Sequence, residues 1–204
     1  MDKPTNGSLR DRCIEESLRI ISEDGVRNLS IRKVARRLGV SHGAPYRHFA
    51  NRDALITEIA IRGTQILKEY VNRGVDYINH TPRENFLQVC QNYIRFAMEQ
   101  RDYFQLILWT ELPRSTDEYP HLAFEANQIF QEVFRLIRDL KDRLNVPIEN
   151  ENLAVLHVFS TIHGYASLMS SGKLAVFNYS LEELEQHAEA ISKILFMSYS
   201  NRLD

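Results

Sequence analysis

Apolar residues recur along almost the whole chain at the spacing of α-helices, and no segment alternates convincingly in the manner of a strand. The first such segment, residues 8–24, places three apolar side chains on one face: Ile14, Leu18 and Ile21. Gly25 is expected to end this helix. Ser30 can cap a second helix, which is expected to end at Gly39, because glycine readily follows the last turn of a helix.

Further capping and helix-breaking residues predict about nine helices in total, and hence an all-α fold. The segment "TPRE", 81–84, has the composition of a capping box, with proline at the first helical position. A short apolar segment precedes the main loop, which is expected over 113–120. The other helices are expected over residues 42–48, 51–78, 81–100, 120–144, 149–171 and from the cap at 180 nearly to the last residue.

Composition narrows the class of protein. The chain has 204 residues, 44% of them hydrophobic and 25% charged, which is typical of a globular protein with one large or two small domains. No apolar run approaches the roughly 18 residues of a membrane span, and the polar N-terminus lacks a secretory signal. We therefore expect a cytoplasmic protein with no membrane partner. Cys13 and Cys90 lie in helical patterns far apart and are expected in the core, without a disulfide, metal or cofactor.

Charge is distributed unevenly. Residues 1–50 carry ten basic and six acidic side chains, a net charge of +4, whereas the other 154 residues carry 15 basic and 21 acidic side chains, a net charge of −6. A basic N-terminal part on an acidic remainder is expected when only the first part meets a polyanion. An ordinary solvated surface could have the same distribution, so charge alone leaves both interpretations open.

The stretch "GVSHGAPYRHF", 39–49, joins two helical patterns through a tight glycine turn. A helix over 30–38, a turn over 39–41 and a helix over 42–48 have the spacing of a helix-turn-helix, whose second helix enters the DNA major groove. Four apolar side chains would hold the two helices at their crossing: Val34, Leu38, Val40 and Phe49.

The composition of 42–52 suits close contact with a duplex. Gly43 and Ala44 leave room for close approach, and Ala44 could contact a thymine methyl group. His42 is placed for a base contact. The longer polar side chains could reach phosphates, and one of them, Arg47, could instead reach a guanine: Tyr46, Arg47, His48 and, at the start of the next helix, Arg52. The same aromatic and basic residues could also be ordinary core and surface.

The stretch "SIRKVARRLGVSHGAPYRHFANRDAL", 30–55, resembles the N-terminal domain of the TetR family of bacterial transcriptional regulators. The resemblance implies a DNA-binding domain over 1–52 and a ligand-binding and dimerisation domain over 53–204. It implies a homodimeric repressor of a palindromic operator, released by a small-molecule effector. By position, Ser30, Ile31 and Arg32 would lie near the DNA backbone and groove, His42, Gly43, Ala44 and Arg47 would face bases, and Tyr46, His48 and Arg52 would hold phosphates. The family often has Thr and Leu where this chain has Ala44 and Pro45.

The C-terminal part carries weaker resemblances. The stretch 163–174 is similar to that of a TetR subgroup with a Trp-His-Gly signature, although Ile162 stands in the place of the tryptophan. Family members usually dimerise through their last two helices. Here those helices offer two apolar stripes, which could equally belong to the core: Phe159, Ile162, Ala166 and Met169 on the first, and Leu184, Ala188, Ile191 and Leu195 on the second.

Two segments supply candidates for an effector pocket, "YFQLILWTEL" and "IFQEVFRLI". With two polar groups from a later helix, they suit an apolar or aromatic ligand, although each could simply be core: Tyr103, Phe104, Leu108, Trp109, Phe130, Phe134, His157 and Tyr165. A ligand-independent regulator or activator would share the same N-terminal domain. An enclosed cavity of a few hundred Å³ would favour an effector, and a filled core would not.

An enzyme is the remote alternative, and we predict that the protein is not one. The sequence contains no HExxH, GxSxG or GxxxxGK[ST] motif and no cysteine cluster. His157 and His163 are separated by about 240° around a helix, so they do not readily chelate one metal ion.

Overall fold

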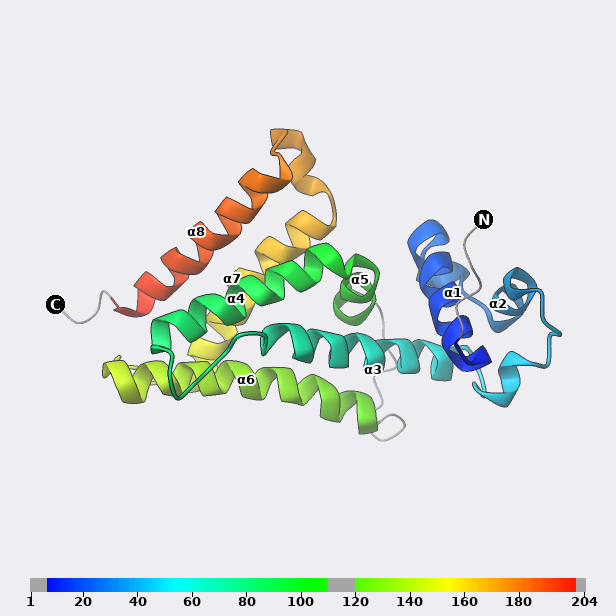
Figure 1. The fold of residues 1–204 in the computed structure, drawn as a ribbon, viewed down its shortest axis with the longest axis horizontal. Helices are drawn as coiled ribbons and strands as arrows, with labels where there is room; N and C mark the ends of the chain where they lie inside the picture. Colours follow the sequence, from blue (N-terminus) through cyan, green and yellow to red (C-terminus); the bar gives the residue numbers. More distant parts are fainter. Residues whose placement is uncertain (1–6, 110–119, 201–204) are drawn as a thin grey trace. The chain divides into compact units, whose positions relative to one another are not determined.

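The computed structural model describes residues 7–109 and 120–200, which form eight α-helices and three short 3-10 helices, without a strand (Figure 1). The predicted all-α fold is confirmed. The chain divides into two compact units: unit 1 comprises Met1–Gly63 and Asp102–Ala123, and unit 2 comprises Thr64–Arg101 and Phe124–Asp204. Among the described helices, none has the length and apolarity needed to cross a membrane.

Unit 1 is built on α1, Leu9–Asp24, which packs against α2, Ile31–Leu38. The 3-10 helices η1, Val26–Asn28, and η2, Pro45–Arg47, also contact α1. The start of α3, Arg52–Val71, and nearly all of α5, Arg101–Trp109, also belong to this unit. Its buried core includes Cys13, Ile14, Ile20, Leu29, Val34, Phe49, Leu55 and Ile59.

The predicted cap at Ser30 and the predicted ends at Gly25 and Gly39 are confirmed, and Ser8 caps the first helix. The Ser8 side chain accepts a hydrogen bond from the Asp11 N–H, and the Ser30 side chain accepts one from the Lys33 N–H. Gly25 and Gly39 follow the two helices with φ of 81° and 65°, a region that side chains disfavour. Local sequence therefore decides where these helices begin and end.

The third predicted helix, 42–48, does not form as an α-helix. Residues 42–44 are a turn, and only Pro45–Arg47 is helical, as the 3-10 helix η2. Pro45 has no N–H to donate to the Ser41 carbonyl, so an α-helical bond cannot form there, and the Ala44 N–H bonds Ser41 instead. The segment is a tight series of turns rather than a regular helix.

The fourth helix, expected to reach about residue 78, ends at Val71 as α3. Gly74 has a φ of 68°, and the Asp76 carboxylate accepts hydrogen bonds from the N–H groups of Ile78 and Asn79 and from the Asn79 amide. The Asp76 N–H also donates to Asn85 Oδ1, and the Asn85 side-chain amide donates to the Asp76 carbonyl. These bonds satisfy the backbone in a turn and so compete successfully with a longer helix.

Unit 2 contains the last residues of α3 and four longer helices: α4, Pro82–Glu99; α6, which begins in unit 1, Pro120–Leu144; α7, Glu151–Ser170; and α8, Leu181–Ser200. The 3-10 helix η3, Lys173–Phe177, joins α7 to α8. α4 packs against both α7 and α8, and hydrogen bonds pair His157 with Tyr199 and Tyr165 with Leu184, so α7 and α8 are antiparallel.

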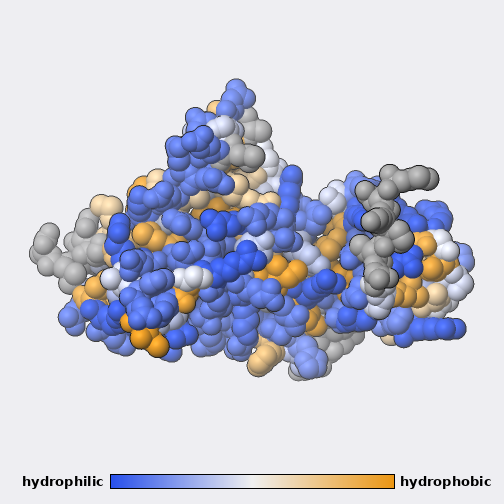
Figure 2. Space-filling view, in the orientation of Figure 1, coloured by the Kyte–Doolittle hydropathy of each residue, from blue (hydrophilic) through white to orange (hydrophobic). Residues whose placement is uncertain are grey.

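The capping box at Thr81 and Glu84 is confirmed, and Ser180 and Glu183 cap α8 reciprocally. The predicted loop over 113–120 lies almost entirely outside the described residues. On the face drawn in Figure 2 the surface is mostly hydrophilic, with small separate hydrophobic patches. Most of the apolar residues that define the helical pattern are thus inside the two units.

We predict that the turn at Asp76 makes stability depend on acidity. The hydrogen bonds from Asn79 and Ile78 lower the pKa of Asp76 from 3.8 to about 2. The ionised form therefore stabilises the folded state above about pH 4, and this contribution is lost as the pH falls towards 2. The melting temperature of the Asp76→Asn variant, measured by circular dichroism, should lie below that of the wild type near neutral pH, and the gap should close on acidification.

Asp142→Asn is the control, because Asp142 is exposed on α6. Its difference from the wild type should stay small at every pH. A gap for Asp76→Asn that is unchanged between about pH 5 and pH 2 would contradict the assignment.

Candidate nucleic-acid interface

Helix α2 presents three different faces. Its apolar face buries Ile31, Val34 and Ala35 against the core of unit 1. At its end the Gly39 N–H donates to the Arg36 carbonyl and the Val40 N–H to the Ala35 carbonyl, which turns the chain towards residues 42–49. The turn therefore has the local geometry that the glycine in the sequence predicts.

A second face of α2 is paired with acidic residues of α1. The Lys33 Nζ lies 2.7 Å from the Asp24 carboxylate, and Arg37 lies 2.7 Å from Glu23 and 3.4 Å from Glu16. The hydrogen bond from Lys33 lowers the pKa of Asp24, and the hydrogen bond to Glu23 raises the pKa of Arg37. These two basic residues are thus used to orient α2 on α1.

The third face carries Arg32 and Arg36, one turn apart and both exposed. Within residues 7–109 and 120–200 neither has an ion-pair partner, in contrast to Lys33 and Arg37. Arg36 was not among the residues predicted for DNA contact, although its position four residues after Arg32 places both on one helical face. This face offers two guanidinium groups to an external anion.

Residues 42–49 combine exposed polar side chains with two buried anchors. His42, Arg47 and His48 are exposed, and 47% of Tyr46 is accessible. Pro45 and Phe49 are buried and hold the segment on the core. The predicted polar residues therefore lie at the surface, and the aromatic Phe49 belongs to the core.

Gly43 is exposed, and the fold does not require glycine there. Its φ is not positive, and a methyl group added to its Cα would have no atom within 4 Å. Gly39, a few residues earlier, has a positive φ that does favour glycine. The absence of a side chain at Gly43 thus leaves the surface of the segment open without serving the fold.

Two residues predicted for DNA contact are engaged within the protein. Ile31 is only 3% exposed, so its side chain serves the core. Arg52 donates from Nε to the Leu29 carbonyl at 3.0 Å and from Nη2 to the Val26 carbonyl at 2.8 Å. Its Nη1 lies 3.4 Å from Asp53. Arg52 thus ties the start of α3 to the connection between α1 and α2.

The other predicted residues of this region are accessible. Ser30 is exposed, with its side-chain oxygen already capping α2, and Ala44 is half-buried. No group of three or more His, Cys, Asp or Glu side chains in the described part of the chain could hold a metal ion. The exposed side chains of Arg32, Arg36 and residues 42–48 are of the types that contact phosphates and base edges.

Two family models match the chain. "Bacterial regulatory proteins, tetR family" matches residues 14–59, and "Tetracyclin repressor-like, C-terminal domain" matches residues 86–190, more than half of the chain. The chain belongs to the TetR family. It is therefore a DNA-binding transcriptional regulator and not an enzyme.

This TetR-family protein is similar to a transcriptional regulator in sequence and to two solved structures in fold. An HTH-type transcriptional regulator of Staphylococcus aureus is 26% identical over 132 residues, 64% of this chain and 66% of the relative, just under two thirds of its length. A protein of unknown function from Rhodococcus sp. RHA1 has a TM-score of 0.79 at 24% identity, over 98% of this chain and 100% of its own. The TetR family transcriptional regulator PfmR from Thermus thermophilus has a TM-score of 0.73 at 18% identity, over 91% and 97%. At these identities the two structures show a shared fold.

The residues predicted to form the effector pocket of this TetR-family protein do not form a single group in the structure. Tyr103 and Phe104 are buried in unit 1, whereas the candidates on α6 and α7 belong to unit 2. The side chains of Leu108 and Trp109 lie outside the described part of the chain. In unit 2, Phe130 and His157 are exposed, Phe134 is half-buried, and Tyr165 is buried and donates a hydrogen bond to the Leu184 carbonyl.

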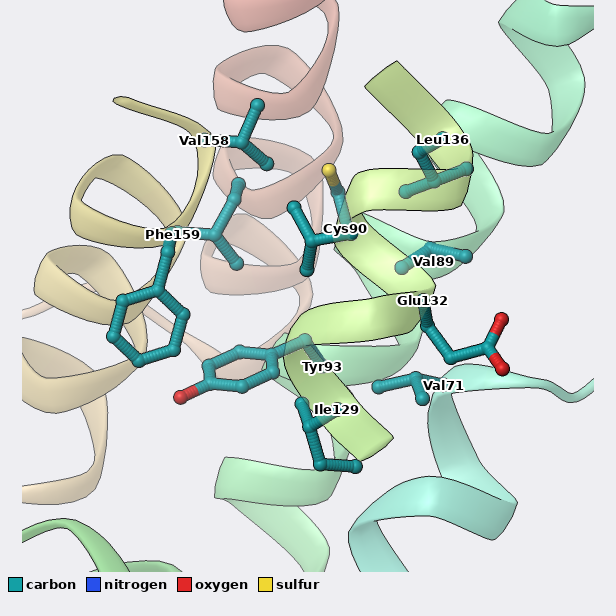
Figure 3. A pocket seen from close by; sticks show the side chains of 11 residues that line it. Val71, Val89, Cys90, Tyr93, Ile129, Glu132, Leu136, Val158 and Phe159 are labelled. Atoms are coloured by element: carbon teal, nitrogen blue, oxygen red, sulfur yellow. The ribbon is translucent and has the colours of Figure 1, made fainter. Parts of the chain in front are cut away.

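Unit 2 instead has a small apolar pocket of about 30 Å³ between α4, α6 and α7 (Figure 3). Phe159 and Ile162, predicted for the dimer interface, line it. Burial raises the pKa of the Cys90 thiol, which also lines it. The sequence offered only one sign of this pocket, the helical spacing of apolar residues such as Val89 and Tyr93. The complete lining is Val71, Val89, Cys90, Tyr93, Ile129, Glu132, Val133, Leu136, Val158, Phe159 and Ile162.

The two predicted dimerisation stripes lie largely inside the single chain. Four of the eight side chains are buried: Ile162, Ala166, Ala188 and Leu195. The other four are half-buried: Phe159, Met169, Leu184 and Ile191. Different apolar side chains are exposed on the same two helices, and sequence periodicity did not single them out: Leu153, Leu156 and Leu168 on α7, and Ile194 and Met197 on α8.

The geometry of Arg52 predicts a stability effect. Lysine at position 52 keeps the positive charge but lacks the guanidinium fork that reaches two carbonyls. We expect Arg52→Lys to lower the free energy of unfolding by about 1 kcal/mol, since hydrogen bonds from charged groups contribute at this scale and the side chain is partly exposed. Chemical denaturation followed by circular dichroism measures the change.

The matched control is Arg47→Lys, because Arg47 is exposed and has no ion-pair partner in the described residues. Its stability should equal that of the wild type. Equal stabilities for Arg52→Lys and the wild type would show that the two carbonyl contacts contribute nothing.

Proposed function

We propose that this TetR-family protein is a cytoplasmic repressor that binds a palindromic operator as a homodimer and is released by a small apolar effector. The proposal rests on the different contacts that the basic residues of α2 make. Lys33 and Arg37 hold the helix on α1, while Arg32 and Arg36 remain accessible beside residues 42–48. We infer that these exposed arginines bind DNA. We assign DNA binding to the N-terminal domain, 1–52, and effector binding and dimerisation to 53–204.

The exposed residues divide into contacts with the backbone and contacts with bases. We assign Arg32, Arg36, Tyr46 and His48 to phosphates, with Ser30 near the backbone, since phosphate contacts fix the register on the duplex. His42, Ala44 and Arg47 are assigned to base edges, and Gly43 to close approach. Ile31 and Arg52 act indirectly, by positioning α2 and α3.

The homodimer is proposed to form through α7 and α8. Leu153 and Leu156 are 65% and 58% exposed, and Ile194 and Met197 are 66% and 50% exposed. Large apolar side chains on two neighbouring antiparallel helices are more stable when a second copy buries them than when water surrounds them. Two copies would present two DNA-binding segments, which matches a palindrome of two half-sites.

The proposed effector requires space inside unit 2. The pocket in unit 2 holds about 30 Å³, far below the few hundred Å³ of a ligand site. The small volume of this pocket favours the second candidate, a regulator that responds to no small molecule. We retain the ligand-responsive function for a form of unit 2 in which the pocket is wider.

The experiment that tests the function is selection of bound duplexes from a random DNA pool by the purified full chain, at stated salt concentrations. We expect a palindromic consensus with two half-sites, and affinity that falls steeply with salt. Selection of a single, non-repeated half-site would contradict the homodimer. Salt-sensitive binding without any consensus would contradict the role as a specific repressor.

Gly43→Ala should separate folding from DNA binding. Because a methyl group there meets no atom of the protein, thermal stability should be unchanged or slightly raised. If the DNA comes close to this position, affinity for the selected duplex should fall on the order of tenfold, the scale of one lost specific contact. Fluorescence anisotropy with labelled duplex measures the affinity. Full affinity in Gly43→Ala would show that the duplex does not approach this residue.

A further inference from the structure

The short helix η1, between α1 and α2, carries an arginine whose side chain has no partner among the described residues. We propose that this residue, Arg27, binds a phosphate of the DNA backbone beyond the contacts of α2 and residues 42–48, and that Arg52 positions it. The inference rests on the DNA contacts proposed for residues 30–48 and adds a phosphate subsite on η1.

The basic residues of unit 1 fall into two groups. Five of them pair with acidic residues of α1 or α3: Arg10 with Glu58, Arg19 with Glu16, Lys33 with Asp24, Arg37 with Glu23, and Arg62 with Asp11. Within the described residues 7–63, the exposed arginines without an ion pair are Arg27, Arg32, Arg36 and Arg47. The last three are already assigned to DNA. Arg27 thus has the same exposure and the same lack of an acidic partner as the arginines assigned to DNA.

The backbone around Arg27 is held tightly. Leu29 is only 2% exposed and Val26 is half-buried, so both anchor η1 on unit 1. The Leu29 N–H donates to the Val26 carbonyl at 3.1 Å, and the Asn28 side-chain amide donates to the Asp24 carbonyl at 2.6 Å. Arg27 lies between these contacts with its own side chain exposed. An anchored backbone reduces the freedom that is lost when such a side chain binds an anion.

Arg52 holds η1 beside the start of α3. Its Nη2 donates to the Val26 carbonyl and its Nε to the Leu29 carbonyl. These two carbonyls flank Arg27 and Asn28 in the chain, so one guanidinium fixes the backbone on both sides of Arg27. Arg52 follows His48 by four residues. Its two hydrogen bonds therefore keep Arg27 close to the end of the segment that we assign to DNA.

The guanidinium group of Arg27 is suited to a phosphate. It can donate two parallel hydrogen bonds to two phosphate oxygens and keeps its charge at every relevant pH. A phosphate contact fixes the register of a protein on the duplex without reading its sequence. It also releases counterions from the DNA, which makes affinity depend more steeply on salt. Arg27 should therefore raise the affinity for every duplex and leave the choice between duplexes unchanged.

The test measures the affinity of the full chain for the selected duplex and for one of unrelated sequence, by fluorescence anisotropy at several salt concentrations. In Arg27→Ala, affinity for both duplexes should fall by a similar factor, on the order of fivefold at about 0.1 M salt. The slope of log affinity against log salt concentration should become shallower by about 0.9 for each Arg27 that contacts a phosphate. Arg27→Lys keeps the charge and should retain the wild-type slope.

Arg101→Ala is the matched control. Arg101 is an exposed arginine of unit 2 without an ion-pair partner in the described residues, so its loss changes the net charge by the same amount. Its salt slope should equal that of the wild type. Circular dichroism confirms that each variant is folded before its affinity is measured.

A double-mutant cycle tests the positioning role of Arg52. Lysine at position 52 keeps the charge but cannot hold both carbonyls, so η1 loses its tether. With Arg27 present, Arg52→Lys should weaken binding by about threefold. In the Arg27→Ala background the same change should leave the affinity unaltered. Equal losses in the two backgrounds would show that Arg52 acts independently of Arg27 and would overturn the positioning role.

The phosphate assignment is overturned if Arg27→Ala keeps the wild-type affinity and slope, or if Arg101→Ala changes the slope as much. A reduced preference for the selected duplex would assign Arg27 to a base and would also overturn it. The unrelated duplex separates this result from the proposed function, because phosphate contacts also act in non-specific binding. A chain that selects no palindrome but has a shallower slope in Arg27→Ala would contradict the repressor and support the subsite. Absence of binding to any duplex would overturn both.

Discussion

The fold of unit 1 depends on the way α2 is fixed to α1. A helix of eight residues is too short to be stable by itself, so its orientation has to come from packing and from charges. Buried Val34 and Ala35 supply the packing, and Lys33 and Arg37 supply ion pairs with three acids of α1. Because these pairs lie near the surface, each contributes modestly, and their value is directional. They engage the basic residues of one face of α2 and leave Arg32 and Arg36 accessible on another.

Features that depend on neighbouring residues were predictable from the sequence, and features that depend on distant residues were not. Ser30, Gly39 and the Thr81–Glu84 box act on their immediate neighbours, so the pattern of letters is enough to place them. The end of α3 was missed because Asn85, on the next helix, stabilises the competing turn at Asp76. The segment 42–48 was predicted as a helix from the spacing of a helix-turn-helix, but Pro45 lacks the N–H that an α-helical bond to the Ser41 carbonyl requires.

Side chains that serve two purposes were the hardest to assign. Arg52 looks like any exposed arginine at the start of a helix, and only the structure shows its guanidinium on the carbonyls of Val26 and Leu29. The apolar stripes of α7 and α8 were correctly seen as apolar, but periodicity cannot tell whether α4 or a second chain covers them. The pocket lining comes from residues as distant in sequence as Val71 and Phe159, a grouping that no local pattern encodes.

Both cysteines of the chain are free thiols buried in helical cores, as expected from the sequence. Burial raises the pKa of Cys13 and Cys90, so neither side chain is present as the thiolate that oxidants and electrophiles attack. The two buried thiols therefore lack the low pKa and the exposure that characterise redox-sensing cysteines.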